Sequence, residues 1–210
     1  MNHRRDIDGL RAIAVSGVIL AHAGFGFVPA GHAGVDVFFV ISGFLIGGIV
    51  AAELDAGKFS FRAFYARRAR RILPALLVML ALTIPMGLFL MTPEQLRYFG
   101  GGALAAVLFL SNVWFFNRID YFNPGAAEDP LIHTWSLGVE EQFYFVVPLL
   151  MAGLFRFGKG LAFAVIAALA TASFALVLKT APEQPMAAFY LLHTRAWDLL
   201  VGVMAALSAD

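Results

Sequence analysis

The chain consists of long apolar stretches separated by short polar segments, and most of the stretches have the length of a membrane-spanning helix. A helix needs about 20 residues to cross ~30 Å of hydrocarbon. The pattern predicts an all-α fold, a polytopic transmembrane helix bundle with about seven spans. The predicted spans are residues 10–29, 34–52, 72–91, 99–116, 142–155, 161–178 and 196–209.

Two of these spans are unusual at their ends. The fifth is short, and we expect its helix to begin earlier, near Trp135. The seventh runs into the C-terminus at Asp210 without a flanking polar segment. We therefore expect residues 1–210 to be a single transmembrane domain that forms the N-terminal part of a longer protein.

Composition supports a lipid environment. Hydrophobic residues make up 60% of the chain and charged residues 14%, whereas soluble domains carry about 25% charged residues. A soluble fold of this composition would have too little polar sequence to cover its surface. The chain contains no cysteine, which excludes disulfides, thiolate metal sites and cysteine nucleophiles. The sequence predicts no metal site and no nucleic-acid partner, and membrane lipid is its expected surrounding.

Lysine and arginine residues predict the orientation, because short cytoplasmic loops are enriched in them. The turn at residues 29–33 has none, so we expect this turn outside and the N-terminus in the cytoplasm. The segment after the second span is expected in the cytoplasm because it is basic, with Lys58, Arg62, Arg67, Arg68, Arg70 and Arg71.

Simple alternation of spans becomes inconsistent further along the chain. It places residues 117–141 in the cytoplasm although they are mainly acidic, and it places Arg156 and Lys159 outside. Either the charge bias is weak in this region, or one of the third and fourth segments does not cross the membrane.

The first span carries two candidate catalytic residues, Arg11 and His22. They are eleven residues apart, so they share one face of a helix and are separated by roughly 16 Å along its axis. Asp8 lies one turn before Arg11 and can pair with it. A histidine inside an apolar span is expected to face a cavity or a polar partner. The structural alternative is that Arg11 reaches the interface and His22 forms an interhelical hydrogen bond.

An arginine-rich loop before the third span is the second candidate. Guanidinium groups bind phosphate through two parallel hydrogen bonds, so Arg67, Arg68, Arg70 and Arg71 could form a phosphate clamp. The alternative is that the loop only marks the cytoplasmic side or contacts anionic lipid. Taken alone, these residues favour the alternative.

Polar residues at the edges of three further spans are candidates for lining a site. Asp36 lies near the outer end of the second span, where Gly43 and Gly47 form a small-residue packing face. Glu140 and Glu141 enter an apolar helix side by side, which solvation alone does not explain. The same group contains His133, Trp135, Ser136 and Arg195, although arginine is also a common interface anchor.

These segments, in this order, resemble the N-terminal part of the acyltransferase-3 family of multi-spanning membrane acyltransferases. The last segment, residues 195–199, resembles the family's Arg-x-Trp-Glu-Leu string with Asp198 in place of glutamate. The other matching strings are residues 6–15, 34–46, 64–75 and 133–144.

The resemblance implies a function. Proteins of this family transfer an acyl group, usually acetyl, from cytoplasmic acyl-CoA to a carbohydrate or other acceptor across the bacterial inner membrane. The family's Arg-x10-His pair corresponds to Arg11 and His22, and its Arg-x-x-Arg loop to Arg68 and Arg71, although Arg67 and Arg70 fit the same spacing. Members normally have about ten spans, so activity of these residues alone is not implied.

The sequence therefore predicts an acyl-CoA-dependent O-acyltransferase with no bound cofactor. In this mechanism the arginines hold the phosphates of CoA, and His22 is the general base that deprotonates an acceptor hydroxyl. Burial would keep the imidazole neutral. An acyl-histidine intermediate is a variant of this mechanism. The alternatives are a transporter or channel that uses the same polar residues as a pathway, and a non-catalytic scaffold.

Overall fold

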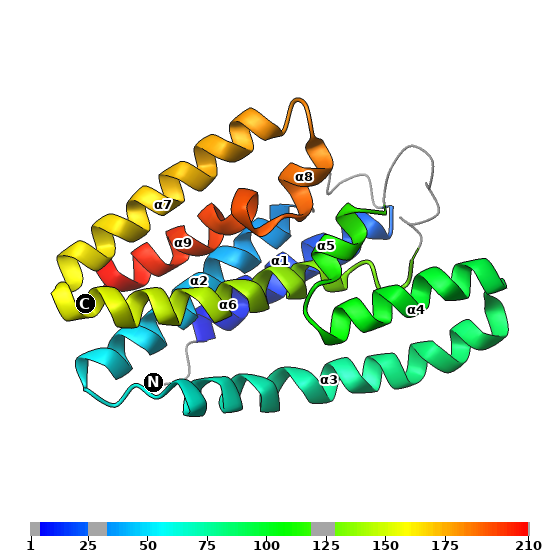
Figure 1. The fold of residues 1–210 in the computed structure, drawn as a ribbon, viewed down its shortest axis with the longest axis horizontal. Coiled ribbons are helices and arrows are strands. Elements are labelled where there is room, and N and C mark those ends of the chain that lie inside the picture. The colour runs from blue at the N-terminus through cyan, green and yellow to red at the C-terminus, as the bar shows by residue number, and fades with distance from the viewer. Residues whose placement is uncertain (1–4, 25–32, 119–128, 210) are drawn as a thin grey trace.

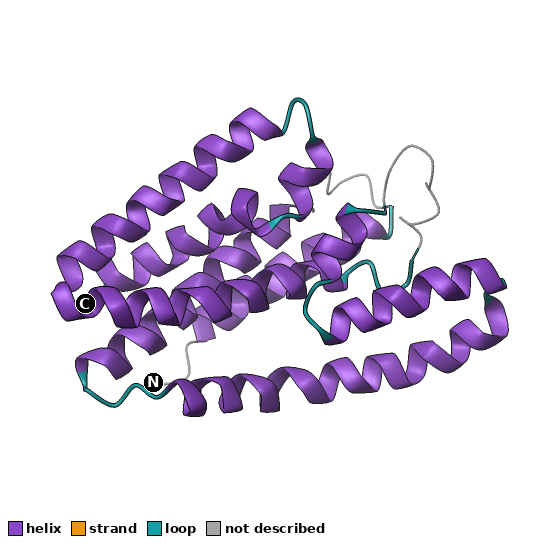
Figure 2. Ribbon diagram, in the orientation of Figure 1, coloured by secondary structure: helices purple, strands orange, loops and turns teal. Residues whose placement is uncertain are grey.

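A computed structural model describes residues 5–24, 33–118 and 129–209 of the chain. All regular secondary structure in these residues is helical (Figure 2), which confirms the predicted all-α fold. The helices are α1 (Arg5–His22), α2 (Ala33–Asp55), α3 (Phe61–Leu90), α4 (Pro93–Val107), α5 (Ser111–Phe116), α6 (Thr134–Leu154), the 3-10 helix η2 (Phe155–Phe157), α7 (Lys159–Thr180), α8 (Pro185–Tyr190) and α9 (Leu192–Ser208).

Helix α2 packs against α1, α6 and α9, and α7 packs against α9 (Figure 1). Glycines bring α2 and α9 into backbone contact. A Cβ on Gly43 would overlap the carbonyl of Leu199, and a Cβ on Gly47 would lie 3.0 Å from the Cα of Val203. The packing face predicted from Gly43 and Gly47 is therefore confirmed.

Four helices among the described residues are long and apolar enough to cross a membrane, so the predicted seven spans are not confirmed. Helix α1 is too polar, because its 18 residues include Arg5, Asp6, Asp8 and Arg11. Helix α9 has only 17 residues. The four are Ala33–Asp55, Phe61–Leu90, Thr134–Phe157 and Lys159–Thr180.

Two predicted helix starts have different outcomes. Helix α6 begins at Thr134, as expected from the short fifth span. Helix α3 begins at Phe61, eleven residues before the predicted third span, so the predicted arginine-rich loop is wrong. Ser60 caps α3 by accepting a hydrogen bond from the Ala63 amide at 3.4 Å. Arginine is a good helix former, and basic residues can therefore continue the helix out of the apolar region.

The predicted fourth span, residues 99–116, is not one helix. Helix α4 ends at Val107, Phe109 has a left-handed backbone with φ 56°, and α5 begins at Ser111. The side-chain amide of Gln142 donates to the Phe109 carbonyl at 2.9 Å, so this backbone carbonyl at the break has a hydrogen-bond partner. Non-helical backbone at membrane depth needs such a partner.

The break explains the charge pattern that alternation could not. Helices α2 and α6 run in the same direction through the bundle (Figure 1). At their C-terminal ends, Lys159 pairs with Asp55 at 2.6 Å, which places the turn before α7 beside the turn after α2. We call this end of the bundle the basic end. Of the two explanations for the charge pattern, a weak charge bias or a segment that does not cross the membrane, the structure favours a fourth segment that does not cross. The basic end holds Lys58, Arg62, Arg67, Arg70, Arg71, Arg156 and Lys159.

Candidate active site

Two glutamates of α6 meet polar residues of two other helices. The hydroxyl of Ser42 on α2 donates to Glu140 Oε1 at 2.7 Å. The guanidinium of Arg68 on α3 donates to Glu141 Oε1 at 3.0 Å, and both side chains are mostly buried. The same guanidinium lies 4.0 Å from the ring centroid of Tyr144. Both carboxylates are therefore held by partners from other helices, as buried charges require.

Arg11 of α1 joins this group. Its guanidinium lies over the ring of Phe38 on α2, 5.4 Å from the ring centroid. The Nε atoms of Arg11 and Arg68 are buried and have no hydrogen-bond partner among the described residues. We call Arg11, Ser42, Arg68, Glu140 and Glu141 the acid–arginine cluster. It brings together residues from α1, α2, α3 and α6 that the sequence could only present separately.

The four arginines predicted to act together have different surroundings. Arg68 alone faces the interior, and with Glu141 it lines a cavity of about 430 Å³ between α3, the α4–α5 break and α6. Arg67 pairs with Glu53 at 2.6 Å on the surface, while Arg70 and Arg71 are exposed. Because Arg68 and Arg71 are three residues apart on a helix, they lie on neighbouring positions of one face.

His22 is not buried, contrary to expectation. It is the last residue of α1 and its side chain is exposed. Residues 25–32, which complete the predicted first span, lie outside the described part of the chain. The ring Nδ1 lies 2.9 Å from the Val18 carbonyl. A carbonyl can only accept, so Nδ1 is the donor in this contact.

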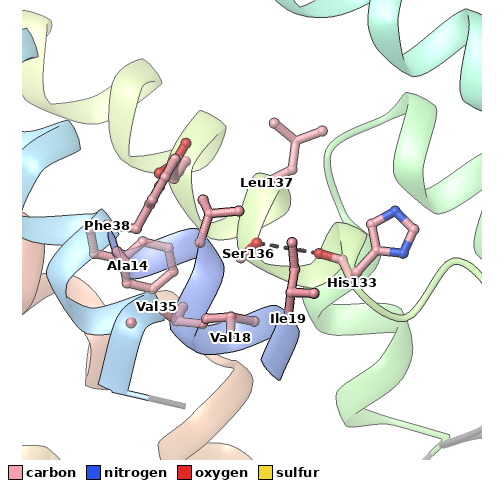
Figure 3. Close-up of a pocket in the computed structure, with 12 residues that line it drawn as sticks. Ala14, Val18, Ile19, Val35, Phe38, His133, Ser136 and Leu137 are labelled. Atoms are coloured by element: carbon pink, nitrogen blue, oxygen red, sulfur yellow. Dashed lines mark hydrogen bonds between the residues drawn. The ribbon is translucent and has the colours of Figure 1, made fainter. Parts of the chain in front are cut away.

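A cavity of about 510 Å³ lies between the last turns of α1, the first turns of α2 and the first turns of α6. Figure 3 shows Val18 and Ile19 from α1, with Ser136 and Leu137 from α6 on the facing wall. Glu140 of the acid–arginine cluster also lines it. The cavity thus extends from this cluster to the turn that precedes His22.

A second charged group joins α2 to α9. Arg195 pairs with Asp36 and lies 3.7 Å from a carboxylate oxygen of Asp198. Its guanidinium lies 5.4 Å from the ring of Phe39 and 6.0 Å from that of Trp135. Arg195 is therefore buried within the bundle, and the alternative of an interface anchor is wrong. Asp198, which is fully buried, was not among the predicted site residues.

The remaining predicted residues surround these groups without joining the acid–arginine cluster. Asp8 is exposed on α1, and His133 is exposed at the start of α6. Ser136 donates to the His133 carbonyl at 3.3 Å and lines the larger cavity. Just before α6, burial raises the pKa of the Asp129 carboxyl, although the Leu131 amide donates to it at 2.8 Å and opposes this rise.

Sequence reasoning missed a polar network at the α4–α5 break. The Gln142 amide donates to Asn112 Oδ1 at 2.7 Å, and Asn112 in turn donates to the Tyr190 carbonyl at 3.1 Å. Ser111 donates to the Thr134 carbonyl at 2.6 Å. The adjacent polar residues Ser111 and Asn112 inside an apolar run could have indicated this network, since buried polar groups within a membrane bundle require hydrogen-bond partners.

Comparisons with known proteins agree with the resemblance noted in the sequence. A family model described as an acyltransferase domain, that of the acyltransferase-3 family, matches residues 4–209. The peptidoglycan O-acetyltransferase OatA of Listeria monocytogenes is 36% identical over 93% of the chain and 32% of its own length. The putative peptidoglycan O-acetyltransferase YrhL of Bacillus subtilis is 35% identical over 96% of the chain and 32% of its own length.

A shorter match reaches a third relative. The O-acetyltransferase OatA of Staphylococcus aureus is 40% identical over 70% of the chain and 24% of its own length. The chain thus spans about a third or less of the curated relatives that it matches. No solved structure matches the chain.

Proposed function

We propose, because the chain belongs to the acyltransferase-3 family, that it transfers an acyl group from acyl-CoA to a carbohydrate hydroxyl on the other side of a membrane. Acetyl is the first candidate for the acyl group and peptidoglycan for the acceptor, because the relatives are named peptidoglycan O-acetyltransferases. The bacterial inner membrane is the proposed location, with the basic end in the cytoplasm. Residues 1–210 then form the transmembrane acyltransferase domain.

The pairing of Arg68 with Glu141 and of Ser42 with Glu140, beside a cavity that leads toward His22, carries the proposal. Interacting groups from four helices create a polar centre inside an apolar bundle, which is costly and is found chiefly at functional sites. The basic end supplies Arg70 and Arg71 close to Arg68 along α3, so that CoA phosphates could contact them. The acyl end of the donor then lies past the acid–arginine cluster, in the larger cavity.

The chemical step requires a base at the outer end of this path. In the proposed step, Nε2 of His22 takes the proton from the acceptor hydroxyl, and the oxygen attacks the thioester carbonyl. The tetrahedral intermediate collapses as the C–S bond breaks, and the imidazolium returns its proton to the CoA thiolate. Products are the O-acyl ester and free CoA. The hydrogen bond from Nδ1 to the Val18 carbonyl supports this role because it fixes the orientation of the imidazole ring.

A histidine comparison tests the proposal. Membranes from cells that express the complete gene product containing this chain are supplied with radiolabelled acetyl-CoA, and label in the carbohydrate fraction is counted. His22→Gln should lower transfer by roughly 10²–10⁴-fold, because glutamine hydrogen-bonds but cannot accept a proton near neutral pH. His193→Gln is the matched control, since His193 is also exposed.

The outcomes separate the base role from a structural one. Protein abundance and acyl-CoA binding should stay near wild type in both variants, because a general base contributes little to donor affinity. A fully active His22→Gln variant would refute the base role. Absence of any acyl transfer by the wild-type protein would refute the proposed function itself.

A further inference from the structure

The larger cavity offers a ligand almost no polar contact. Its walls are formed mainly by aliphatic and aromatic side chains, with three polar residues among them. Ser136 donates to the His133 carbonyl and Glu140 accepts from Ser42. In Figure 3 the His133 ring points away from the labelled side chains of α1. The apolar wall includes Val15, Val18, Ile19, Val35, Phe38 and Leu137.

This lining excludes the carbohydrate as the occupant. Each sugar hydroxyl that enters an apolar space loses its hydrogen bonds to water and gains none in return, which is unfavourable. A hydrocarbon chain has no hydrogen bonds to water to lose, and its transfer from water to an apolar space lowers the free energy. The occupant that fits the wall is therefore apolar.

The size of the cavity indicates more than an acetyl group. A volume of about 510 Å³ is several times what the three heavy atoms of an acetyl group fill, at about 30 Å³ for each atom of water size. Its position ties it to the proposed reaction, because the side chain of Val18 lines it while the carbonyl of Val18 holds His22 at 2.9 Å. An acyl chain seated here would contact Val18, one helical turn from the proposed base.

We propose that this cavity is the acyl-chain pocket of the donor and that it accepts chains of about four to eight carbons as well as acetyl. This inference rests on the proposed function for the identity of the donor. It assigns chain-length selectivity to the walls of α1, α2 and α6, with Val18 and Leu137 as the side chains that set the available length.

The test compares acetyl-, butyryl-, hexanoyl- and octanoyl-CoA as donors for the complete gene product in membranes. The wild-type protein should transfer the longer chains at rates within tenfold of acetyl. Val18→Phe and Leu137→Phe fill the pocket from opposite walls and should lower the ratio of octanoyl to acetyl transfer at least tenfold. Burying one methylene favours binding by about fourfold, so losing two of them gives this effect.

Ile13→Phe on α1 and Val146→Phe on α6 are the matched controls, because both side chains are exposed on the outer surface of the bundle and lie outside the pocket. They should leave the chain-length ratio unchanged. A wild-type protein that transfers acetyl but none of the longer chains would overturn the inference while leaving the proposed function intact. An identical ratio in the filled variants and the controls would also overturn it.

A binding measurement makes the inference independent of catalysis. Residues 1–210 contain no cysteine, so once any cysteine outside them is replaced by serine, Val18→Cys contributes the one thiol that a membrane-permeant maleimide can label. Octanoyl-CoA should protect this thiol at least tenfold better than acetyl-CoA, and free CoA should not protect it. Equal protection by octanoyl-CoA and free CoA would contradict the pocket assignment. Protection by octanoyl-CoA without any acyl transfer would support the pocket and contradict only the proposed function.

Discussion

Lys159 at the start of α7 pairs with Asp55 at the end of α2, with Nζ and Oδ2 2.6 Å apart. The contact joins two turns that are separated by a hundred residues of sequence. It places Arg156 and Lys159 at the same end of the bundle as the arginines of α3. Strict alternation of seven spans would divide these basic residues between the two sides of the membrane. The structure instead places them at one end of the bundle.

This arrangement predicts a specific labelling pattern. Single cysteines at Lys58 and Arg156 should react with an impermeant maleimide from one side of the membrane, and those at Asn117 and Glu183 from the other. We expect the first pair to be cytoplasmic, because the lysines and arginines lie with them. Labelling of Asn117 from the same side as Lys58 would show that residues 99–116 cross the membrane and would contradict the broken α4–α5 arrangement.

The Arg68–Glu141 pair should contribute more to stability than the Arg67–Glu53 pair, although both distances are short. Arg68 and Glu141 expose 15% and 13% of their side chains, whereas Arg67 exposes 50%. Removing one member of a buried pair leaves an uncompensated charge, whereas exposed pairs are worth about 0–1 kcal/mol. Double-mutant cycles with glutamine, measured by denaturation in detergent, should give a coupling of about 1–3 kcal/mol for the first pair.

The second pair should give a coupling below about 0.5 kcal/mol. Arg68→Gln should also weaken acyl-CoA binding, whereas Arg67→Gln should change it less. Equal coupling energies for the two pairs would show that the burial of Arg68 has no energetic consequence. Unchanged CoA affinity in Arg68→Gln would remove Arg68 from the proposed donor site.

Gly43→Ala should destabilise the bundle, because the added Cβ overlaps the Leu199 carbonyl on α9. Overpacking of a close contact costs about 1–3 kcal/mol. Gly48→Ala is the matched control on the same helix, since its Cβ would lie 3.8 Å from the Ala206 Cβ. It should be neutral or stabilising by up to ~1 kcal/mol, the usual helix preference of alanine over glycine. Thermal denaturation of the two variants measures the difference, and equal midpoints would contradict the close packing of α2 on α9.

Gln142→Leu should destabilise the α4–α5 break. The substitution removes the donors to the Phe109 carbonyl and to Asn112, and a buried polar group left without a partner costs about 1–3 kcal/mol. Asn117→Leu is the control, because Asn117 is exposed and, among the described residues, its side chain donates only to the Val113 carbonyl of its own helix. Proteolysis near residues 108–110 should increase in the Gln142→Leu variant and not in the control. Unchanged proteolysis would mean that other contacts hold the break.

Local patterns in the sequence determined the parts of this protein that depend on neighbours along the chain. Apolar stretches of helical length gave the all-α fold, and helical periodicity placed Arg11 and His22 on one face of α1. The four-residue spacing of Gly43 and Gly47 gave the packing face, because residues four apart are neighbours on any helix. The family strings were sufficient for the family itself.

Contacts between distant residues were decided only by the tertiary structure. Arg68 and Glu141 are 73 positions apart, and no periodicity relates them. The tertiary structure also decided where helices end. Helix α1 ends at His22, which is exposed. Gln142 stabilises a break between α4 and α5, inside a stretch of sequence that is continuously apolar. Hydropathy measures whether a segment prefers lipid, whereas the partner that satisfies a charge or a backbone carbonyl is supplied by another helix. The burial of Arg195 between Asp36 and Asp198 follows from the same cause.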